Sequence, residues 1–524
     1  MARRAQPLGI ATGLGIGAAA LALTLALGTI AAVAWRAEPG GAGLGAADLA
    51  AIRFTLLQAL ASAALSTLLA VPVARALARR RFRGRGVLIT LLGAPFILPV
   101  IVAVMGLLAV FGRSGLLSHA LAPLGLGPVD IYGPFGVVLA HVFFNLPLAT
   151  RLVLQGWLAI PAERFRLAAA LGFGPAERFR HLERPMLREV LPGAFLVVFL
   201  ICLTSFAVAL TLGGGPRATT IELAIYQAFR FEFDLGRAAW LALIQVGVSI
   251  TAALAAFAIA VPGAFGPGLD RPVAQIGPDG RGLRLQDMAC LGLAALFLIL
   301  PLAMVALRGL PGLAGLPASV YAAALRSIAV ALGSAALTLA LALPMAIAID
   351  RLGGLAGRTI QAAGTLTIAA SPLVMGTGLF ILLFPLADPR LLALPVTATV
   401  NAAMSLPFAL RALVPTVAEA ERSHGRLADS LGMTGRARLR LMLLPRLRRP
   451  IGFTLGLSAA LSMGDLGVIA LFSDPGHATL PLQLYGLMAA YQMDSAAAAG
   501  LLLLVLSLGL FWIFDRGGRA RAEP

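Results

Sequence analysis

The sequence predicts an all-α polytopic membrane protein with about twelve transmembrane helices. Hydrophobic residues make up 59% of the 524-residue chain and charged residues only 12%, about half of the charged content of soluble domains. The apolar residues fall in runs of roughly 20, the length that a helix needs to cross a bilayer. No stretch between these runs is long enough for a soluble catalytic domain of about 100 residues.

The predicted spans follow one another with short connections. The first comes after MARRAQP, and we expect it to be an uncleaved span, because its run of about 27 residues exceeds the 7–15 of a signal peptide. The spans are 8–34, 52–75, 87–111, 133–158, 189–212, 238–261, 288–307, 323–349, 360–384, 392–414, 453–472 and 497–514.

The basic residues are distributed unevenly between the two sides of the membrane. All 41 are arginine, and the net charge is +18. If the amino terminus lies inside, the inside segments hold 32 of the 41 arginines. This positive-inside bias predicts that both termini are cytoplasmic. It also accounts for the basic excess without nucleic acid, which we do not expect as a partner.

One charged segment occurs twice, 260 residues apart. Residues 166–185 read RLAAALGFGPAERFRHLERP, and residues 426–445 read RLADSLGMTGRARLRLMLLP. The two align without a gap. Beyond the shared RLA, the identical pairs are Leu171 with Leu431, Gly172 with Gly432, Arg178 with Arg438, Arg180 with Arg440, and Pro185 with Pro445.

Further blocks repeat in the same order. SAALSTLLAVPVARALAR (62–79) matches SAALTLALALPMAIAIDR (334–351), and TIELAIYQAF (220–229) matches TLPLQLYGLM (479–488). Chance similarity of Ala/Leu-rich helices is disfavoured, because the matches include proline, arginine, tyrosine and glycine. The chain therefore reads as a tandem duplication of a six-span unit, which gives parallel repeats. We expect halves at 1–262 and 288–524, joined by a cytoplasmic Gly/Pro-containing linker at 263–287.

The repeated segments lie in two charged loops, 161–188 and 419–449, each between the fourth and fifth spans of its half. We expect a short helix that ends at Gly172 or Gly432, because glycine tolerates the left-handed cap. Pro185 and Pro445 are expected to mark entry to the next span. Two such loops on parallel repeats form a pseudo-twofold docking face. The alternative is that the loops are basic only to set the topology.

The glycine-to-proline spacing of these loops resembles the EAA loop of permeases of binding-protein-dependent ABC importers. Arg166 and Arg426 stand where that family has glutamate, and Leu167 and Leu427 replace its first alanine. The positions that match the family pattern are Ala168, Ala428, Gly172, Gly432, Leu444, Pro185 and Pro445.

The resemblance implies the type I importer (MetI-like) permease fold, in the inner membrane of a bacterium. It implies that the two loops couple to two copies of a cytoplasmic ABC ATPase, and that a periplasmic binding protein delivers the substrate. ATP and Mg would be bound by the ATPase, and no cofactor by this chain. The implied coupling residues are Arg166, Ala168, Gly172, Pro185, Arg426, Ala428, Gly432 and Pro445.

Two stretches, 204–245 and LSMGDLGVIALF at 461–472, resemble the thiamine permeases of this family, which also fuse two six-span halves. The resemblance implies import of thiamine or its phosphates. Fused ferric-iron permeases are the alternative, since they share the two-half plan and a TLGGGP-like stretch. The SMGDLG block favours thiamine.

Catalytic motifs are missing from the sequence. The phosphate-binding P-loop requires lysine, and the chain contains none, so any ATPase must be another subunit. We find no HExxH, CxxC or GxSxG motif, and Cys202 and Cys290 fall within predicted spans. We therefore expect no enzyme and no metal site. An ion-coupled secondary carrier is a rival, but such carriers usually place several ionisable groups in mid-membrane. This sequence has few, Asp465 and His141, which argues against a proton relay.

Asp465 is one of the few acids inside a predicted span, and its repeat counterpart is Ser205. An unpaired acid there costs about 2.5–3.5 kcal/mol on insertion scales. One interpretation places Asp465 and Ser205 on the translocation pathway, where an acid suits a cationic substrate. The other is a structural hydrogen bond between helices.

The outward segments 213–237 and 473–496 carry further acids and tyrosines. They are candidates to dock the two lobes of a binding protein, and the alternative is ordinary solvated loops with interfacial tyrosines. The candidate docking residues are Glu222, Tyr226, Asp234, Tyr485 and Asp494.

Overall fold

The computed structural model describes residues 9–37, 45–93, 97–258, 280–367, 370–472 and 475–519, and these are helical with no strand among them. The first half contains α1 Ile10–Arg36, α2 Ala46–Arg79, α3 Arg85–Leu91, α4 Val100–Phe111, α5 Leu116–Leu121, α6 Pro134–Ala159, α7 Ala162–Ala170, α8 Pro175–Arg178, α9 Arg184–Leu203, α10 Ala207–Leu212, α11 Ile221–Arg230 and α12 Leu235–Ala258. The second half contains α13 Arg281–Gly309, α14 Ala318–Leu352, α15 Gly354–Leu366, α16 Pro372–Leu383, α17 Pro389–Ser430, α18 Gly435–Ala437, α19 Leu444–Met463, α20 Gly467–Phe472, α21 Leu480–Ala489 and α22 Met493–Arg519.

The predicted polytopic all-α fold is confirmed. In the described residues, ten helices are long and apolar enough to cross a membrane. The predicted spans 360–384 and 453–472 are not among these ten, because each divides into two shorter helices, α15 with α16 and α19 with α20. Their repeat counterparts are interrupted as well, since α3 stops before α4 and α9 stops before α10. The third and fifth spans of both halves are therefore broken helices.

The first long helix of each half packs against the other half. Helix α1 contacts α14, α15 and α16, while α13 contacts α2 and α4. Glycines permit these close approaches: a Cβ on Gly15 of α1 would lie 2.3 Å from the carbonyl oxygen of Pro344, and one on Gly106 of α4 would lie 2.6 Å from that of Pro301. Small residues at such crossings are typical of membrane helix packing. The exchange ties the two halves together.

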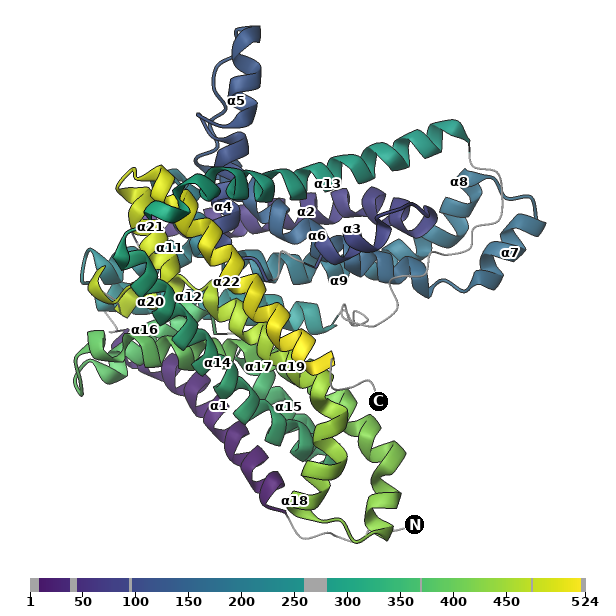
Figure 1. Ribbon diagram of the computed structural model, residues 1–524, viewed down its shortest axis with the longest axis vertical. Helices are drawn as coiled ribbons and strands as arrows, with labels where there is room; N and C mark the ends of the chain where they lie inside the picture. Colours follow the sequence, from purple (N-terminus) through teal and green to yellow (C-terminus); the bar gives the residue numbers. More distant parts are fainter. Residues whose placement is uncertain are drawn as a thin grey trace.

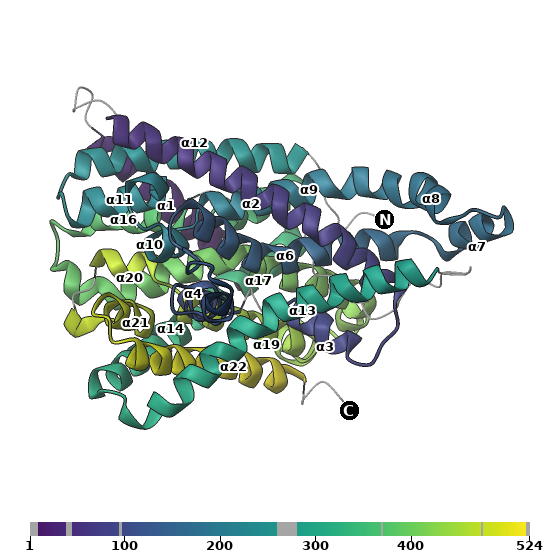
Figure 2. The ribbon, with the colours of Figure 1, turned by 90° about the horizontal axis from the view of Figure 1, so that it is seen from above.

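The two halves meet at one end of the molecule and diverge at the other. Figure 1 shows two arms, with α7 and α8 at the tip of one and α18 at the tip of the other. At the opposite end α11, α16, α20 and α21 lie together, as Figure 2 also shows. The largest apolar cluster lies among these helices and draws residues from both halves, including Phe206, Tyr226, Leu466 and Leu484. We call the two regions the loop end and the opposite end.

The predicted linker at 263–287 is only partly visible. Residues 263–279 lie outside the described residues, and residues 281–287 form the first turns of α13. The half boundaries that we predicted are not tested further by these helices and stay predictions.

We expect Gly15→Val to destabilise the protein, because the added side chain collides with the backbone of α14 at Pro344. Overpacking of this kind costs typically about 1–3 kcal/mol. Gly17→Val is the matched control: it lies two residues away on α1, is exposed, and would place its Cβ in open space. Thermal unfolding of the detergent-solubilised chain should show a lower Tm for the first variant only. Equal Tm values for the two variants would contradict the packing.

Candidate functional site

Each charged loop contains a helix end closed by a left-handed glycine. In the first loop Phe173 N–H donates to the carbonyl of Ala168 at 2.9 Å and Gly172 N–H to that of Ala169 at 3.1 Å, and Gly172 has φ +73°. This pair of bonds is the Schellman motif. The second loop repeats it, with Gly432 at φ +65° and Met433 N–H donating to Ala428 at 2.8 Å. The predicted glycine caps are confirmed.

The helix before the cap differs between the loops. In the first loop, α7 is a separate short helix that begins after Pro161, an extended residue with ψ 137°. In the second loop, the equivalent segment is the end of the 42-residue α17. Glu421 occupies the position that corresponds to Pro161. Proline removes a backbone donor and interrupts a helix, whereas glutamate lets it continue.

Pro185 and Pro445 lie within continuous helical stretches and do not mark a break. Each stands near the start of a long helix, α9 or α19. Each follows a π-helical segment, Phe179–Glu183 in the first loop and Arg438–Leu443 in the second. The residue before each proline donates to the carbonyl five residues earlier, Arg184 to Phe179 and Leu444 to Leu439, which is the hydrogen bond of a π turn.

The equivalent arginines Arg178 and Arg438 are both buried, at 8% and 9% exposure, but different ion pairs hold the two loops. Arg438 pairs with Glu421 and Asp429 of α17, and its Nε donates to Glu421 Oε1 at 3.0 Å. The hydrogen bonds that Arg438 donates to the carboxylate of Glu421 raise the pKa of Arg438, so this side chain stays charged. In the first loop, buried Glu183 accepts from Arg75 of α2 at 2.8 Å.

The coupling residues predicted from the family pattern divide into buried and exposed sets. Ala168 and Ala428 are each 3% exposed and face inward. Arg166 and Arg426 are exposed, and Arg166 pairs with exposed Glu163 at 2.8 Å. The leucines nearest to them face solvent in both loops, at 58–62% exposure: Leu167, Leu171, Leu427 and Leu431. Each loop thus presents two exposed leucines beside its capping glycine.

Ser205 and Asp465 lie at the breaks of the fifth spans. Ser205, between α9 and α10, is 2.7 Å from His141 Nε2 of α6. Asp465, between α19 and α20, lies beside Asn401 of α17 and the backbone N–H groups at 467–469, and Asn401 Nδ2 donates to Ser462 Oγ at 3.0 Å. His141 and Asn401 are themselves repeat counterparts, 260 residues apart. The two halves therefore place equivalent polar pairs at equivalent breaks.

The two breaks face each other where the halves meet. Phe206, directly after Ser205, lies 3.6 Å from the Cβ position of Gly467 in the other half. Phe206 also makes an edge-to-face contact with Tyr226 of α11, with ring centroids 5.2 Å apart. We call this region, residues 204–206 and 464–467 with Tyr226, the seam. Phe206 thus lies against both halves of the seam.

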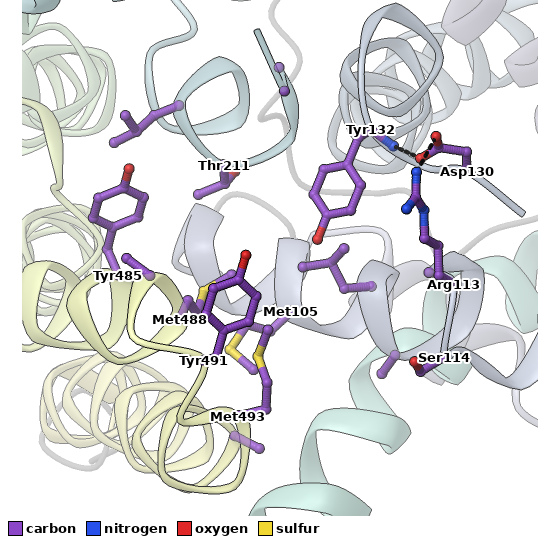
Figure 3. A pocket seen from close by; sticks show the side chains of 18 of the residues that line it. Met105, Arg113, Ser114, Asp130, Tyr132, Thr211, Tyr485, Met488, Tyr491 and Met493 are labelled. Atoms are coloured by element: carbon purple, nitrogen blue, oxygen red, sulfur yellow. Dashed lines mark hydrogen bonds and ion pairs between the residues drawn. The ribbon is translucent and has the colours of Figure 1, made fainter.

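Two adjoining cavities open beside the seam at the opposite end. The larger, about 1520 Å³, lies between α4 and α10 of the first half and α13, α21 and α22 of the second. Figure 3 shows Tyr132, Tyr485 and Tyr491 around it, with methionines between them. The smaller, about 250 Å³, is lined by Tyr226 and Tyr485 among others. Tyr485 belongs to the walls of both cavities.

The predicted docking residues fall into two groups. Asp234 and Asp494 are exposed at the opposite end. Glu222 and Tyr226 are buried, at 1% and 8% exposure, so they do not lie on the outer surface. Glu222 bonds to Ser371 at the start of α16, and Tyr485 is half-buried in the cavity wall. The described residues contain no group of three or more acids, histidines or cysteines that could hold a metal ion.

Sequence reasoning missed several residues of this site. The match of Arg178 with Arg438 was a signal for the two buried arginines, and the 260-residue offset of His141 from Asn401 was a signal for the polar pairs. Phe206 carried no signal, because a phenylalanine in an apolar span is unremarkable.

These features define a membrane-spanning permease of the ABC type, with two repeated halves and a paired loop on each. The chain is 40% identical over 513 residues to the thiamine transport system permease protein ThiP of Brucella abortus, an alignment that covers 95% of this chain and 94% of the relative. The ThiP protein of Escherichia coli K12 is 38% identical over 475 residues, which cover 89% and 88% of the two chains.

A more distant relative is the trehalose/maltose permease protein MalF of Thermococcus litoralis, 32% identical over 182 residues, 33% of this chain and 61% of that protein. No protein-family model matches the sequence. At this identity and coverage, the chain belongs to the family of thiamine transport system permease proteins.

We expect Arg438→Met to loosen the second charged loop, because Glu421 and Asp429 lose their shared cation. Losing hydrogen bonds to a charged group costs about 1.5–3 kcal/mol, so amide exchange around 425–437 should accelerate about tenfold or more. Hydrogen exchange followed by mass spectrometry measures this. Arg440→Met, which removes an exposed neighbouring charge, is the control. Unchanged exchange in the Arg438 variant would show that the ion pairs do not order the loop.

Proposed function

We propose that the chain is the membrane-spanning permease subunit of an ATP-driven importer, and that it forms the pathway for thiamine or thiamine phosphates. The proposal places it in a bacterial inner membrane with both termini in the cytoplasm, so that the loop end is cytoplasmic. The observation that carries it is the match to thiamine permeases along 95% of the chain.

The loop end provides the surface for the motor. Exposed apolar side chains stand among the charges of both loops, which is typical of a protein–protein contact. They are Leu167, Leu171 and Phe179 in the first loop and Leu427, Leu431 and Leu441 in the second. Two equivalent loops suit two copies of one ATPase. ATP and Mg would bind to these ATPase subunits, since this chain has no lysine for a P-loop. Gly172 and Gly432 would set the shape of the contact, with Arg166 and Arg426 at its rim.

The opposite end provides the entry. A binding protein would dock there, with exposed Asp234 and Asp494 as contacts, and release its ligand toward the seam. Ser205 and Asp465 would line the path, with Asp465 as the acid that attracts a cation. Closure of the ATPases would move the two loops together. Because the arms diverge from a shared apolar contact at the opposite end, this motion would pivot the halves about that contact.

A ferric-iron importer of the same two-half type is the alternative function. Iron(III) favours clusters of oxygen and nitrogen ligands, and the described residues hold no such cluster of acids, histidines or cysteines. An ion-coupled carrier is a weaker alternative, because few ionisable groups lie near the seam. Transport assays separate all three.

We expect cells that lack thiamine import to take up labelled thiamine when they express this chain with its ATPase and binding protein, and to take up no ferric iron through it. Asp465→Asn should lower uptake several-fold at limiting thiamine, since the path loses its acid. Glu189→Gln, an exposed charge on α9, should leave uptake unchanged. Iron uptake without thiamine uptake would overturn the assignment of thiamine as the substrate. Normal thiamine uptake by the Asp465 variant would show that this residue does not act in the path.

We expect Gly172→Val with Gly432→Val to weaken association with the ATPase, because β-branched residues are strained at φ +73° and +65°. Gly174→Val is the control, since Gly174 lies in the same loop with φ −71°. Co-purification and ATP-driven uptake report the effect. A double variant that assembles and transports normally would refute the docking role.

A further inference from the structure

The small cavity beside the seam is lined by uncharged residues only, whereas charged residues line part of the large cavity. Its volume is about 250 Å³, close to the lower end of small-molecule sites, roughly 300–1,000 Å³. None of its lining residues is charged. Aromatic rings and small residues form its walls, chiefly Tyr226, Phe231, Tyr485, Leu210 and Gly214, with Gln227 as a neutral polar group.

The two tyrosines come from repeat-equivalent positions, Tyr226 on α11 and Tyr485 on α21. Both tyrosines line the one cavity, so the cavity lies between the two halves. One tyrosine from each half thus bounds the same small space, and a movement that separates the halves here would separate the two tyrosines.

The ring of Tyr226 is held in place by its neighbours. It makes edge-to-face contacts with Phe206 at 5.2 Å and with Phe231 at 5.7 Å between centroids. Such contacts fix ring orientation. Because Phe206 also reaches the break at Gly467, Tyr226 is linked through Phe206 to both broken fifth helices. The small cavity therefore adjoins the seam.

We propose that Tyr226 and Tyr485 form an aromatic clamp that binds a planar heteroaromatic cation as it passes from the large cavity to the seam. This inference rests on the proposed function, because thiamine carries a cationic thiazolium ring beside an aromatic pyrimidine. Cation–π contacts hold such rings without a counter-charge. A site on a transport path must also release its ligand, and a clamp without acids binds weakly enough to do so.

The neighbouring cavity suits the rest of the ligand. Arg113, Arg217 and Arg308 line the large cavity, with Asp130 and Asp494, and Arg113 is already paired with Asp130 at 2.9 Å. A phosphate tail would therefore remain on the side of the large cavity while the ring occupies the clamp. Tyr485, in both walls, marks the boundary between the two environments.

The test uses proteoliposomes that contain the full chain, its ATPase and its binding protein, with labelled thiamine as the probe. We expect Tyr226→Leu and Tyr485→Leu to lower thiamine accumulated per ATP hydrolysed by about threefold to tenfold, the range of one lost cation–π contact. Tyr226→Phe and Tyr485→Phe retain the ring and should retain most of the transport. Tyr321→Leu, on the exposed face of α14, is the control, and the Tm of each variant reports folding.

The outcomes separate the clamp from other roles. Leucine variants that accumulate thiamine as well as the wild type would overturn the clamp, and so would phenylalanine variants that fail as badly as leucine variants. Loss of binding-protein-stimulated ATP hydrolysis would assign the tyrosines to docking and also overturn it. Failure of the wild type to accumulate thiamine would instead overturn the proposed function.

Discussion

The structure depends on one constraint: backbone polar groups inside a membrane must find partners within the protein. In the part of the chain that the structure describes, the helices of four spans end before the span is complete, and each helix end frees carbonyl or amide groups that lipid cannot satisfy. Side chains supply the partners. Gln58 donates to the carbonyl of Cys202 at 2.9 Å and Gln245 to that of Leu203 at 3.0 Å, while Ser371 accepts from Val374 N–H at the start of α16. The breaks therefore lie where the halves cover them.

This constraint explains why the halves interlock. If α1 stayed with its own half, the breaks of the second half would lose part of their cover, since α1 packs against α15 and α16. Helix α13 makes the reciprocal exchange. Glu222 adds a further link, because it crosses from α11 to Ser371 in the other half. The halves diverge at the loop end and share an apolar cluster at the opposite end.

Much of the fold was predictable from the sequence, because membrane spans and repeats leave direct patterns. The glycine caps at 172 and 432 followed from spacing. The breaks did not, since 453–472 reads as one apolar run, and the carboxylate of Asp465 faces the backbone N–H groups at the start of α20 only in the folded chain. The partners of Arg438 and the facing tyrosines depend on tertiary contacts, which single-sequence patterns do not encode.

The fusion of both halves into one polypeptide has a consequence for the polar pairs at the seam. In a symmetric homodimer, an acid at position 465 would appear twice, facing its own copy across the axis, and each copy would carry an insertion cost of about 2.5–3.5 kcal/mol. Gene fusion releases the halves from that identity. This chain keeps a single carboxylate opposite Ser205, and asparagine opposite His141. Covalent linkage thus allows equivalent positions of the two repeats to carry different side chains.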